Sequence, residues 1–314
     1  MQDSFITSLE EAKKLLDLPT HKLLFLASKI RQANFASKID LCAIINCRSG
    51  NCSMNCAFCA QSSHYGTNIK TFPLLDGKIL VERILTLAKM PVAHIGLVTS
   101  GAALSMSELE QILHILAKLP AKIMPRICTS FGRLSDEGLS LLREAKITRY
   151  HHNLETTSSY YPKICQTQTW QSRKETVLKA KNTGFSNCTG GLFGLGEGWL
   201  ERIQFAFELR DLNIQNIPLN FLHPQPGTPL GTRQPLTAEE ALRIIAIFRL
   251  ILPTATLRIC GGRPITFQTR EAEIFKAGAN ALMIGDYLTT AGAGPKHDLE
   301  LLASLGLKAT IDAN

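Results

Sequence analysis

Residues 94–118 read HIGLVTSGAALSMSELEQILHILAK, and the pattern in this stretch decides the fold. Its first part, His94–Thr99, is an apolar run typical of a buried strand, and Ser107–Lys118 has the spacing of an amphipathic helix. Ser107 is followed at the third position by an acidic residue, Glu110, which is a helix-start signal. A strand followed by a helix is the repeating unit of a parallel sheet.

The same unit recurs along the chain. We predict strands at Leu41–Ile45, His94–Thr99, Lys122–Cys128, Ile147–His152, Ser186–Leu192, Asn216–Phe221, Thr256–Cys260 and Asn280–Ile284. Helical patterns lie between most of them, for example at Ser135–Ala145, Trp170–Asn182, Trp199–Arg210 and Thr237–Leu250. This count, without an inserted domain, favours an α/β fold of the closed (β/α)8 TIM-barrel type over an open sheet. We expect residues 1–38 to form an N-terminal helical extension and residues 39–314 to form the barrel, with its active site at the carboxyl ends of the strands.

Composition and charge narrow the function classes. With 45% hydrophobic and 19% charged residues, the 314-residue chain has ordinary globular composition. The first residues are acidic and helical in pattern, unlike a secretion signal, and the apolar stretch Ile244–Leu252 is too short to span a bilayer. We therefore expect a cytoplasmic protein with no membrane partner. The net charge of +8 is scattered, which argues against nucleic acid and suits docking of a small acidic electron carrier.

Three of the nine cysteines, Cys52, Cys56 and Cys59, fall within eight residues. Disulfides are rare in the cytosol, so clustered thiols there indicate metal binding or catalysis. Three thiolates with the spacing C-x3-C-x2-C can each bind one iron of a cubane and leave the fourth iron open to chelate a small molecule. A structural zinc site with His64 as the fourth ligand is the simpler alternative.

This spacing, with Phe58 just before the last cysteine, resembles the radical S-adenosylmethionine superfamily. The resemblance implies a [4Fe–4S] cluster that binds the amine and carboxylate of S-adenosylmethionine, and a 5′-deoxyadenosyl radical that abstracts hydrogen from the substrate. The segment GGLFGLGE, residues 190–197, is similar to the superfamily's strand along the adenine. By this resemblance Phe58, Gly194 and Glu197 contact the cofactor. Read alone, the glycines also fit an ordinary strand-to-helix turn.

Beyond the superfamily, the chain resembles the biotin synthase family from about residue 39 to 305. The segments that carry the likeness are SGNCSMNCAFCAQS, YHHNLET, CTGGLFGLGE, PLNFLHPQPGTPL and RICGGR. The resemblance implies a transferase that inserts sulfur into dethiobiotin to give biotin, the last step of biotin biosynthesis. It further implies a sacrificial [2Fe–2S] cluster as the sulfur donor, a flavodoxin- or ferredoxin-type reductant and a homodimer.

The family holds this auxiliary cluster with three cysteines and one arginine. Cys128 and Cys188 match two of the cysteines and Arg258 matches the arginine, but Gly96 stands where the family has the remaining cysteine. We leave three explanations open. Cys260, two residues past Arg258 on the same face of a strand, can substitute as a ligand. In the second explanation, Cys42 or Cys47 near the first strand provides the missing ligand. In the third, the auxiliary cluster has another composition, or the chain catalyses a related reaction without this cluster.

The segment YHHNLET supplies polar side chains at a strand end. The resemblance implies that Asn153 and Glu155 bind the ribose of S-adenosylmethionine, and a carboxylate suits two hydroxyls because it only accepts hydrogen bonds. It also places His151 and Asn220 at the ureido ring of dethiobiotin. The side chain of His152 alternates away from its neighbours, so we expect it in the barrel wall. Among the remaining thiols, we interpret Cys165 as a plain small hydrophobic residue.

Two other functions stay open at this point. The first is a different radical S-adenosylmethionine enzyme on the same barrel, of the hydrogenase-maturation or pyrrolysine-pathway kind, and Gly96 favours it slightly. The second is a non-catalytic electron-transfer or cluster-carrier protein. The barrel pattern and the adenine-strand segment argue against a carrier, because a carrier needs no nucleotide site.

Overall fold

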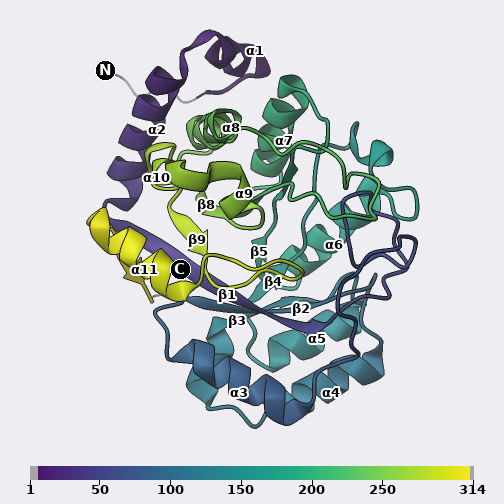
Figure 1. Cartoon of the computed structure of the whole chain (residues 1–314). Coiled ribbons are helices and arrows are strands. Elements are labelled where there is room, and N and C mark those ends of the chain that lie inside the picture. Colours follow the sequence, from purple (N-terminus) through teal and green to yellow (C-terminus); the bar gives the residue numbers. More distant parts are fainter. Residues whose placement is uncertain (1–5, 312–314) are drawn as a thin grey trace.

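Parallel strands close on themselves at the centre of the computed structural model, which describes residues 6–311 (Figure 1). The eight barrel strands, in order, are β1 (Lys38–Arg48), β2 (His94–Thr99), β3 (Ile127–Ser130), β4 (Arg149–His151), β5 (Ser186–Cys188), β7 (Asn216–Phe221), β8 (Thr256–Ile259) and β9 (Ala281–Met283). Pairing of β9 with β1 closes the ring. The short β6 (Gly191–Phe193) pairs with β7 above β5, and β10 (Lys308–Thr310) adds to β1. The predicted (β/α)8 barrel is confirmed.

Helices cover the outside of the barrel (Figure 1). They are α3 (Gly77–Ala88), α4 (Met106–Leu116), α5 (Asp136–Glu144), α6 (Trp170–Asn182), α7 (Trp199–Asp211), α8 (Ala238–Ile251), α9 (Arg263–Phe267), α10 (Glu273–Lys276) and α11 (Pro295–Ser304). Short 3-10 turns occur at η1 (Lys14–Asp17), η2 (Ala121–Arg126), η3 (Tyr161–Lys163) and η4 (Gln268–Arg270). Apolar faces of these helices pack on the outward side chains of the strands and form the main core.

The chain before β1 forms α1 (Leu9–Lys13), η1 and α2 (Thr20–Phe35). Arg243 of α8 donates hydrogen bonds to the backbone oxygens of Leu16 (2.9 Å) and Leu18 (2.8 Å), and Thr20 donates to Glu239 of α8 (2.6 Å). These bonds fasten the helical segment to the barrel's outer layer. The separate N-terminal extension over residues 1–38 stays a prediction, and its first five residues lie outside the described part.

Three predicted element boundaries are wrong. The predicted strand Lys122–Cys128 is mostly the turn η2, because Pro125 lies within it and cannot donate a ladder hydrogen bond. The predicted strand Ser186–Leu192 is split into β5 and β6, so Cys188 ends a strand instead of lying inside one. Helix α4 begins one residue earlier than predicted, at Met106, because Ser105 caps it and shares a capping box with Glu108.

Strand β1 shows how the barrel separates its two faces. Its residues alternate between full and partial burial, as expected for a strand with one face on helices and the other on a cavity. The residues at odd positions belong to the core under the helices, as Ile45 and Cys47 do. Cys42 and Ile44, at even positions, line the barrel interior.

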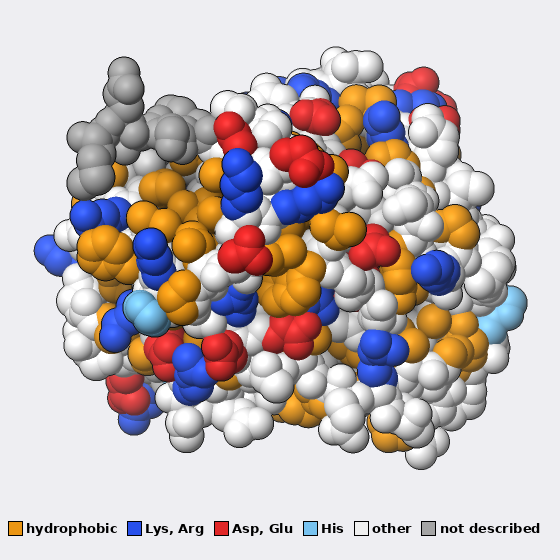
Figure 2. All heavy atoms as spheres, turned by 90° about the horizontal axis from the view of Figure 1, so that it is seen from above, with side chains coloured by type: hydrophobic (Ala, Val, Ile, Leu, Met, Phe, Trp, Pro, Cys, Tyr) orange, Lys and Arg blue, Asp and Glu red, His pale blue; other side chains and the backbone are white. Residues whose placement is uncertain are grey.

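The surface shows mixed charge. On the face drawn in Figure 2, Lys and Arg side chains are interspersed with Asp and Glu instead of forming one continuous basic field. Within residues 6–311, the helices are all too short or too polar to cross a membrane.

Candidate active site

A cavity of about 420 Å³ occupies the barrel interior and opens at the carboxyl ends of the strands. Such a position follows from the fold, because loops after parallel strands converge at this end of a barrel. The cavity brings together most of the predicted site residues, namely Cys52, Cys56, Phe58, Cys59, Cys128, His151, Asn153, Glu155, Cys188, Asn220, Arg258 and Cys260. Gly194 and Glu197 are not part of its lining.

The loop after β1 carries the three clustered cysteines. The Cys52 N–H donates to Gln61 O (2.9 Å) and the Ser63 N–H donates to Cys52 O (2.8 Å), so the two ends of the loop are tied together. Inside it, the Cys59 N–H donates to Cys56 O (2.9 Å), which makes a tight turn between these residues. The loop therefore points all three thiols toward the same cavity.

The three thiols of the loop are not gathered around a single point. Among the described residues, the set whose ligand atoms all lie within 4.8 Å of one another is Glu271, His297 and Asp298, so the three sulfurs of the loop are not all this close together. Thiolates on one zinc ion, each about 2.3 Å from the metal, would lie ~3.8 Å apart. The exposed His64 contacts Ser53 O through its Nε2 (3.0 Å). These observations favour an iron–sulfur cluster over the zinc alternative.

A fourth thiol joins this group, and the sequence interpretation missed it. Sγ of Cys165 lies 3.7 Å from Sγ of Cys56, within hydrogen-bonding distance for sulfur. This hydrogen bond raises the pKa of Cys56 and lowers the pKa of Cys165 to about 5, so the pair loses one proton easily and the second with difficulty. Cys165 is therefore more than a filler of the core, and no local sequence pattern connects it to the cysteine loop.

Asn153 and Glu155 lie together on the cavity wall, after the end of β4. Asn153 Nδ2 donates to Glu155 Oε2 (3.4 Å), and Asn153 Oδ1 accepts from the Gly190 N–H (3.1 Å). Glu155 has a φ of 70°, in the left-handed region that non-glycine residues rarely adopt. Such a conformation persists only where the surroundings enforce it and is common at functional sites.

Arg173 of α6 is the buried cation that holds this pair, and the sequence analysis did not identify it. Its Nη2 lies 3.0 Å from Glu155 Oε1, and its Nε donates to Asn153 O (2.6 Å). Burial raises the pKa of Glu155, while Arg173 acts in the opposite direction. The sequence of α6 contains further basic residues at Lys174, Lys179 and Lys181, so no local pattern singles out Arg173.

Two histidines of β4 and its end also face the cavity. Burial lowers the pKa of His151 to about 4, so its imidazole is neutral near pH 7. His152 lines the cavity as well, and within the described residues its Nε2 has no hydrogen-bond partner. Our expectation that His152 lies in the barrel wall is therefore wrong, because β4 ends at His151 and the strand alternation stops there.

Asn220 connects two strand ends. Its Nδ2 donates to Gly191 O (3.1 Å) and its Oδ1 accepts from the Gly261 N–H (3.0 Å). One amide hydrogen and one lone pair remain for a ligand in the cavity. Asn220 is thus held rigidly while it faces the site.

Glu197 binds its own loop. Its two carboxylate oxygens accept from the N–H groups of Gly194 (2.9 Å) and Gly196 (3.0 Å), and Arg202 Nε donates to Oε1 (2.8 Å). The carboxylate is buried and fully used in this arrangement. The contacts of Gly194 and Glu197 with S-adenosylmethionine stay predictions, and any action of Glu197 would pass through the shape of this turn.

The deep end of the cavity contains Cys128, Cys188 and Arg258. Arg258 Nη2 lies 2.9 Å from Asp40 Oδ2, and Nη1 donates to Asp40 O (3.1 Å). Burial opposes ionisation of Asp40, but Arg258 together with His94 and Arg149 outweighs it and holds the pKa of Asp40 below its usual range. Burial raises the pKa values of the Cys128 and Cys188 thiols, so both are protonated unless a metal replaces the proton.

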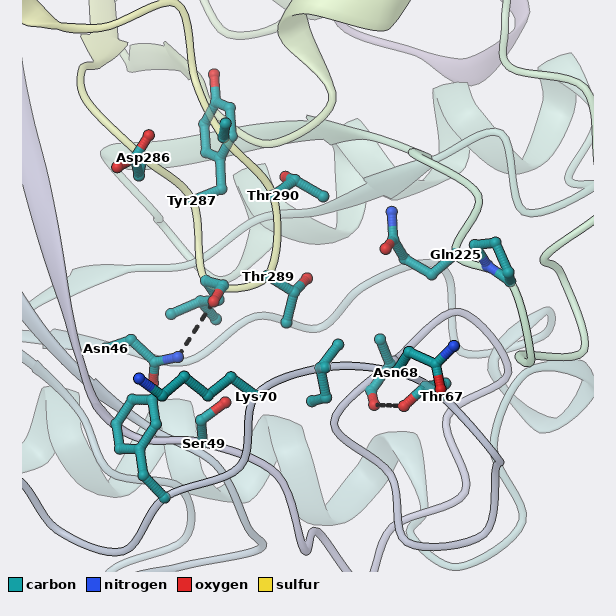
Figure 3. Close-up of a pocket in the computed structure, with 16 residues that line it drawn as sticks. Asn46, Ser49, Thr67, Asn68, Lys70, Gln225, Asp286, Tyr287, Thr289 and Thr290 are labelled. Carbon is teal, nitrogen blue, oxygen red and sulfur yellow. Dashed lines mark hydrogen bonds between the residues drawn. The ribbon is translucent and has the colours of Figure 1, made fainter.

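A second hollow of about 530 Å³ adjoins the mouth of the cavity (Figure 3). Its walls are the end of β1, the segment around residues 67–72 and the loop at residues 286–291. Asn46 Nδ2 donates to Leu288 O (3.1 Å), which fastens this loop to β1 (Figure 3). Ala60, Gln225 and Tyr287 line both hollows, so the two are neighbours.

Comparison with known proteins connects this geometry to a family. Residues 47–209 match the radical SAM superfamily, and residues 218–308 match the biotin and thiamin synthesis associated domain. The chain is 56% identical over 302 residues to the biotin synthase of Desulfovibrio desulfuricans, a match that covers 96% of each chain. The chain belongs to the biotin synthase family. The biotin synthase of Acetivibrio thermocellus is also similar, with 42% identity over 98% of this chain and 97% of that protein.

Solved structures agree on the fold. A methylornithine synthase has a TM-score of 0.83 at 19% identity, over 98% of this chain and 95% of that one. The FeFe-hydrogenase maturase HydG from Carboxydothermus hydrogenoformans has a TM-score of 0.78 at 18% identity, over 96% of this chain and 75% of that one. At such low identities the likeness shows the barrel alone. The alternative enzymes considered from the sequence are therefore not favoured over the biotin synthase family.

Proposed function

We propose that the chain converts dethiobiotin to biotin by radical sulfur insertion, the last step of biotin biosynthesis. The observation that carries this proposal is one cavity with the three-cysteine loop at its mouth and Cys128, Cys188 and Arg258 at its deep end. The 56% identity to a biotin synthase over nearly the whole chain supports the same reaction.

The mouth of the cavity suits S-adenosylmethionine. When bound at Cys52, Cys56 and Cys59, a [4Fe–4S] cluster supplies the electron that releases a 5′-deoxyadenosyl radical from this cofactor. At the ribose, Asn153 can donate or accept a hydrogen bond and the ionised Glu155 accepts from hydroxyls, while Phe58 offers an apolar surface nearby. Enclosure by the barrel keeps water and other hydrogen donors away from the reacting carbon.

Dethiobiotin fits below the cofactor, between the mouth and the deep cysteines. The neutral His151 can donate or accept one hydrogen bond at the ureido ring without adding charge, and Asn220 has one donor and one acceptor site left. The auxiliary cluster, which we place on Cys128, Cys188 and Arg258, would supply the sulfur. The adjoining hollow around residues 67–72 and 286–291 gives a small substrate a route into the barrel.

The remaining partners are carried over from the family. We predict a flavodoxin- or ferredoxin-type reductant, a homodimer and a cytoplasmic location. The scattered net charge of +8 is compatible with an acidic electron carrier.

Anaerobic incubation of the reconstituted protein with dethiobiotin, S-adenosylmethionine and a reductant tests the function. We expect biotin and 5′-deoxyadenosine by mass spectrometry of the products. Cys56→Ala removes one of the three cluster ligands and should abolish both products. Formation of 5′-deoxyadenosine without biotin would indicate a radical enzyme with another substrate. Cleavage of S-adenosylmethionine by Cys56→Ala would refute the assignment of the cluster ligands.

A further inference from the structure

Gly96 of β2 lies where the resemblance predicts a cluster cysteine, and the neighbouring space is already filled. Gly96 and Ile44 of β1 are register partners. A Cβ atom on Gly96 would lie 3.0 Å from Cγ2 of Ile44, closer than nearly all real contacts of this kind. Ile44 would have to move by a few tenths of an ångström to admit any side chain at this position. A replacement thiol has to come from another position of the barrel.

The register of the strands identifies that position. In a (β/α)8 barrel, one interior layer takes its side chains from every second strand. The strands of such a barrel are staggered by about eight residues in total over about eight strands. A layer member two strands further on therefore lies about two residues beyond the hydrogen-bond register partner of the first member. A layer that contains Cys128 can therefore be followed around the ring.

The first step leads from β3 to β5. Cys128 is the register partner of Arg149 on β4. Arg149 is in turn the partner of Ser186 on β5. Two residues beyond Ser186 lies Cys188, so Cys128 and Cys188 belong to the same layer.

The second step leads from β5 to β8. Cys188 is the register partner of Asn216 on β7, and Asn216 is the partner of Thr256 on β8. Two residues beyond Thr256 lies Arg258. The arginine that the resemblance assigns to the auxiliary cluster is thus the third member of this layer.

The third step leads from β8 through β9 to β1. Arg258 is the register partner of Ala281, and Ala281 is the partner of Asp40. Two residues beyond Asp40 lies Cys42. The fourth member of the layer is therefore a cysteine.

The last step returns to β3 and closes the ring. Ile44 pairs with Gly96, and Gly96 pairs with Cys128. Cys128 is therefore level with Ile44 in the hydrogen-bond register, and Ile44 lies two residues beyond Cys42. The step from Cys42 to Cys128 thus advances by two residues, like the three steps before it. All four members of the layer line the same cavity, and the described thiols are free of disulfides.

The two other cysteines considered as substitutes do not fit this layer. Cys47 is at an odd position of β1 and is buried in the core under the helices, where its thiol donates to Ile45 O (3.4 Å). Cys260 follows Arg258 by two residues on β8, so it lies two layers nearer the mouth. Its thiol donates to the Arg258 backbone oxygen (3.6 Å).

We propose that Cys42 is the third thiolate ligand of the auxiliary iron–sulfur cluster and replaces the ligand that Gly96 cannot supply. Cys42, Cys128 and Cys188 form the thiolate set, and Arg258 completes the layer while Asp40, two residues before Cys42 on the same strand, fixes its guanidinium from the deeper side. Soft thiolates are the ligands that iron–sulfur clusters require. The proposal rests on the proposed function for the nature of the cluster, and the position of Cys42 comes from the strand register.

Mössbauer spectroscopy of the anaerobically reconstituted, 57Fe-loaded full chain tests the proposal. The wild type should show a second component beside that of the [4Fe–4S] cluster, with matching iron and sulfide content. Cys42→Ala should lose the second component and keep the first, whose retention also reports an intact fold. Cys42→Ser, which keeps the side-chain volume and offers an oxygen ligand, should keep a second component with altered parameters.

Two matched controls sharpen the result. Cys47→Ala removes a thiol from the same strand on the opposite face, and Cys260→Ala removes one nearer the mouth on the strand of Arg258. Both variants should retain the second component unchanged. An unaltered spectrum in Cys42→Ala and Cys42→Ser, or loss of the component in Cys260→Ala alone, would overturn the proposal. So would a wild type without a second component. Biotin formation by the wild type is measured separately, so failure of the ligand assignment and failure of the function remain distinct.

Discussion

At the scale of single residues, the site contains groups that the motifs do not name. Cys165 contacts the cluster ligand Cys56 at 3.7 Å, and Arg173 fixes the strained Glu155 at 3.0 Å. Cys165 lies more than a hundred residues from Cys56 in the sequence. Arg173 lies some twenty residues from the segment that it binds. Both side chains are at least partly buried. Each adjusts a charged group on which the proposed chemistry depends.

Removal of the Cys165 thiol should change the cluster's reduction potential. In the metal-free chain Cys56 is the donor of its hydrogen bond with Cys165. With iron on Cys56 its sulfur carries no proton, so the proton that the pair retains would lie on Cys165, which would then donate. Hydrogen bonds to ligand sulfurs favour the reduced cluster. Loss of one bond worth about 1 kcal/mol corresponds to roughly 40 mV for one electron. We expect Cys165→Ala to lower the midpoint potential by this order, measured by redox titration with electron paramagnetic resonance. Cys47→Ala removes a buried thiol that belongs to the core under the helices, so it should leave the potential unchanged. An equal potential in all three proteins would contradict the role.

Affinity for S-adenosylmethionine should depend on pH through Glu155. Its pKa is raised by burial, so the neutral form appears at a higher pH than in an ordinary glutamate. Because the ionised form accepts hydrogen bonds from the ribose, affinity should fall as the pH decreases through this pKa. Arg173→Gln removes the opposing cation and should shift the loss to still higher pH. Dissociation constants measured by calorimetry across pH 5–8 check this; a flat profile in both proteins would exclude Glu155 from the ribose site.

At the scale of elements, short strands with glycines decide how closely the wall can pack. A Cβ atom on Gly191 of β6 would lie 2.3 Å from Glu155 O and 2.6 Å from Phe205 Cε1. The glycine thus permits β6 to reach the backbone after β4, where an isolated bridge joins Glu155 and Gly191. The motif that resembles an adenine strand is therefore also a packing requirement of this barrel.

Gly191→Ala should consequently destabilise the protein. Forcing a methyl group against a backbone oxygen costs about 1–3 kcal/mol when the surroundings must shift. We expect a lower melting temperature and weaker binding of S-adenosylmethionine, because Glu155 moves with its carbonyl. Gly66→Ala is the control, since nothing lies within 4 Å of a Cβ atom there. Equal melting temperatures for the two variants would show that the wall adapts freely.

At the scale of the whole molecule, the net positive charge influences how fast charged partner proteins associate with the surface. An excess of positive charge favours approach of an acidic electron carrier and is screened by salt. We expect the rate of cluster reduction by a flavodoxin to decrease as ionic strength rises from about 0.05 to 0.5 M, where the Debye length falls below about 10 Å. Reduction by an uncharged small molecule should be insensitive to salt. A salt-independent flavodoxin rate would leave the net charge without a role in electron transfer.

The sequence by itself determined the barrel and the cysteine loop. Alternating strand and helix patterns are local, and Cys52, Cys56 and Cys59 lie close together along the chain, so spacing alone predicts a shared cluster. The split of the strand at residues 186–192 could not be predicted, because it depends on how closely Gly190 approaches Pro218 O on β7.

Only the tertiary structure decided which distant side chains meet. Cys42 and Cys47 look alike in the sequence, and the strand's alternation together with closure of the ring turns one toward the cavity and the other toward the helices. Likewise, Cys165 reaches Cys56, and Arg173 reaches Glu155, through packing of separate βα units. Such contacts depend on register and barrel closure, which are properties of the whole sheet and are not encoded in any short segment.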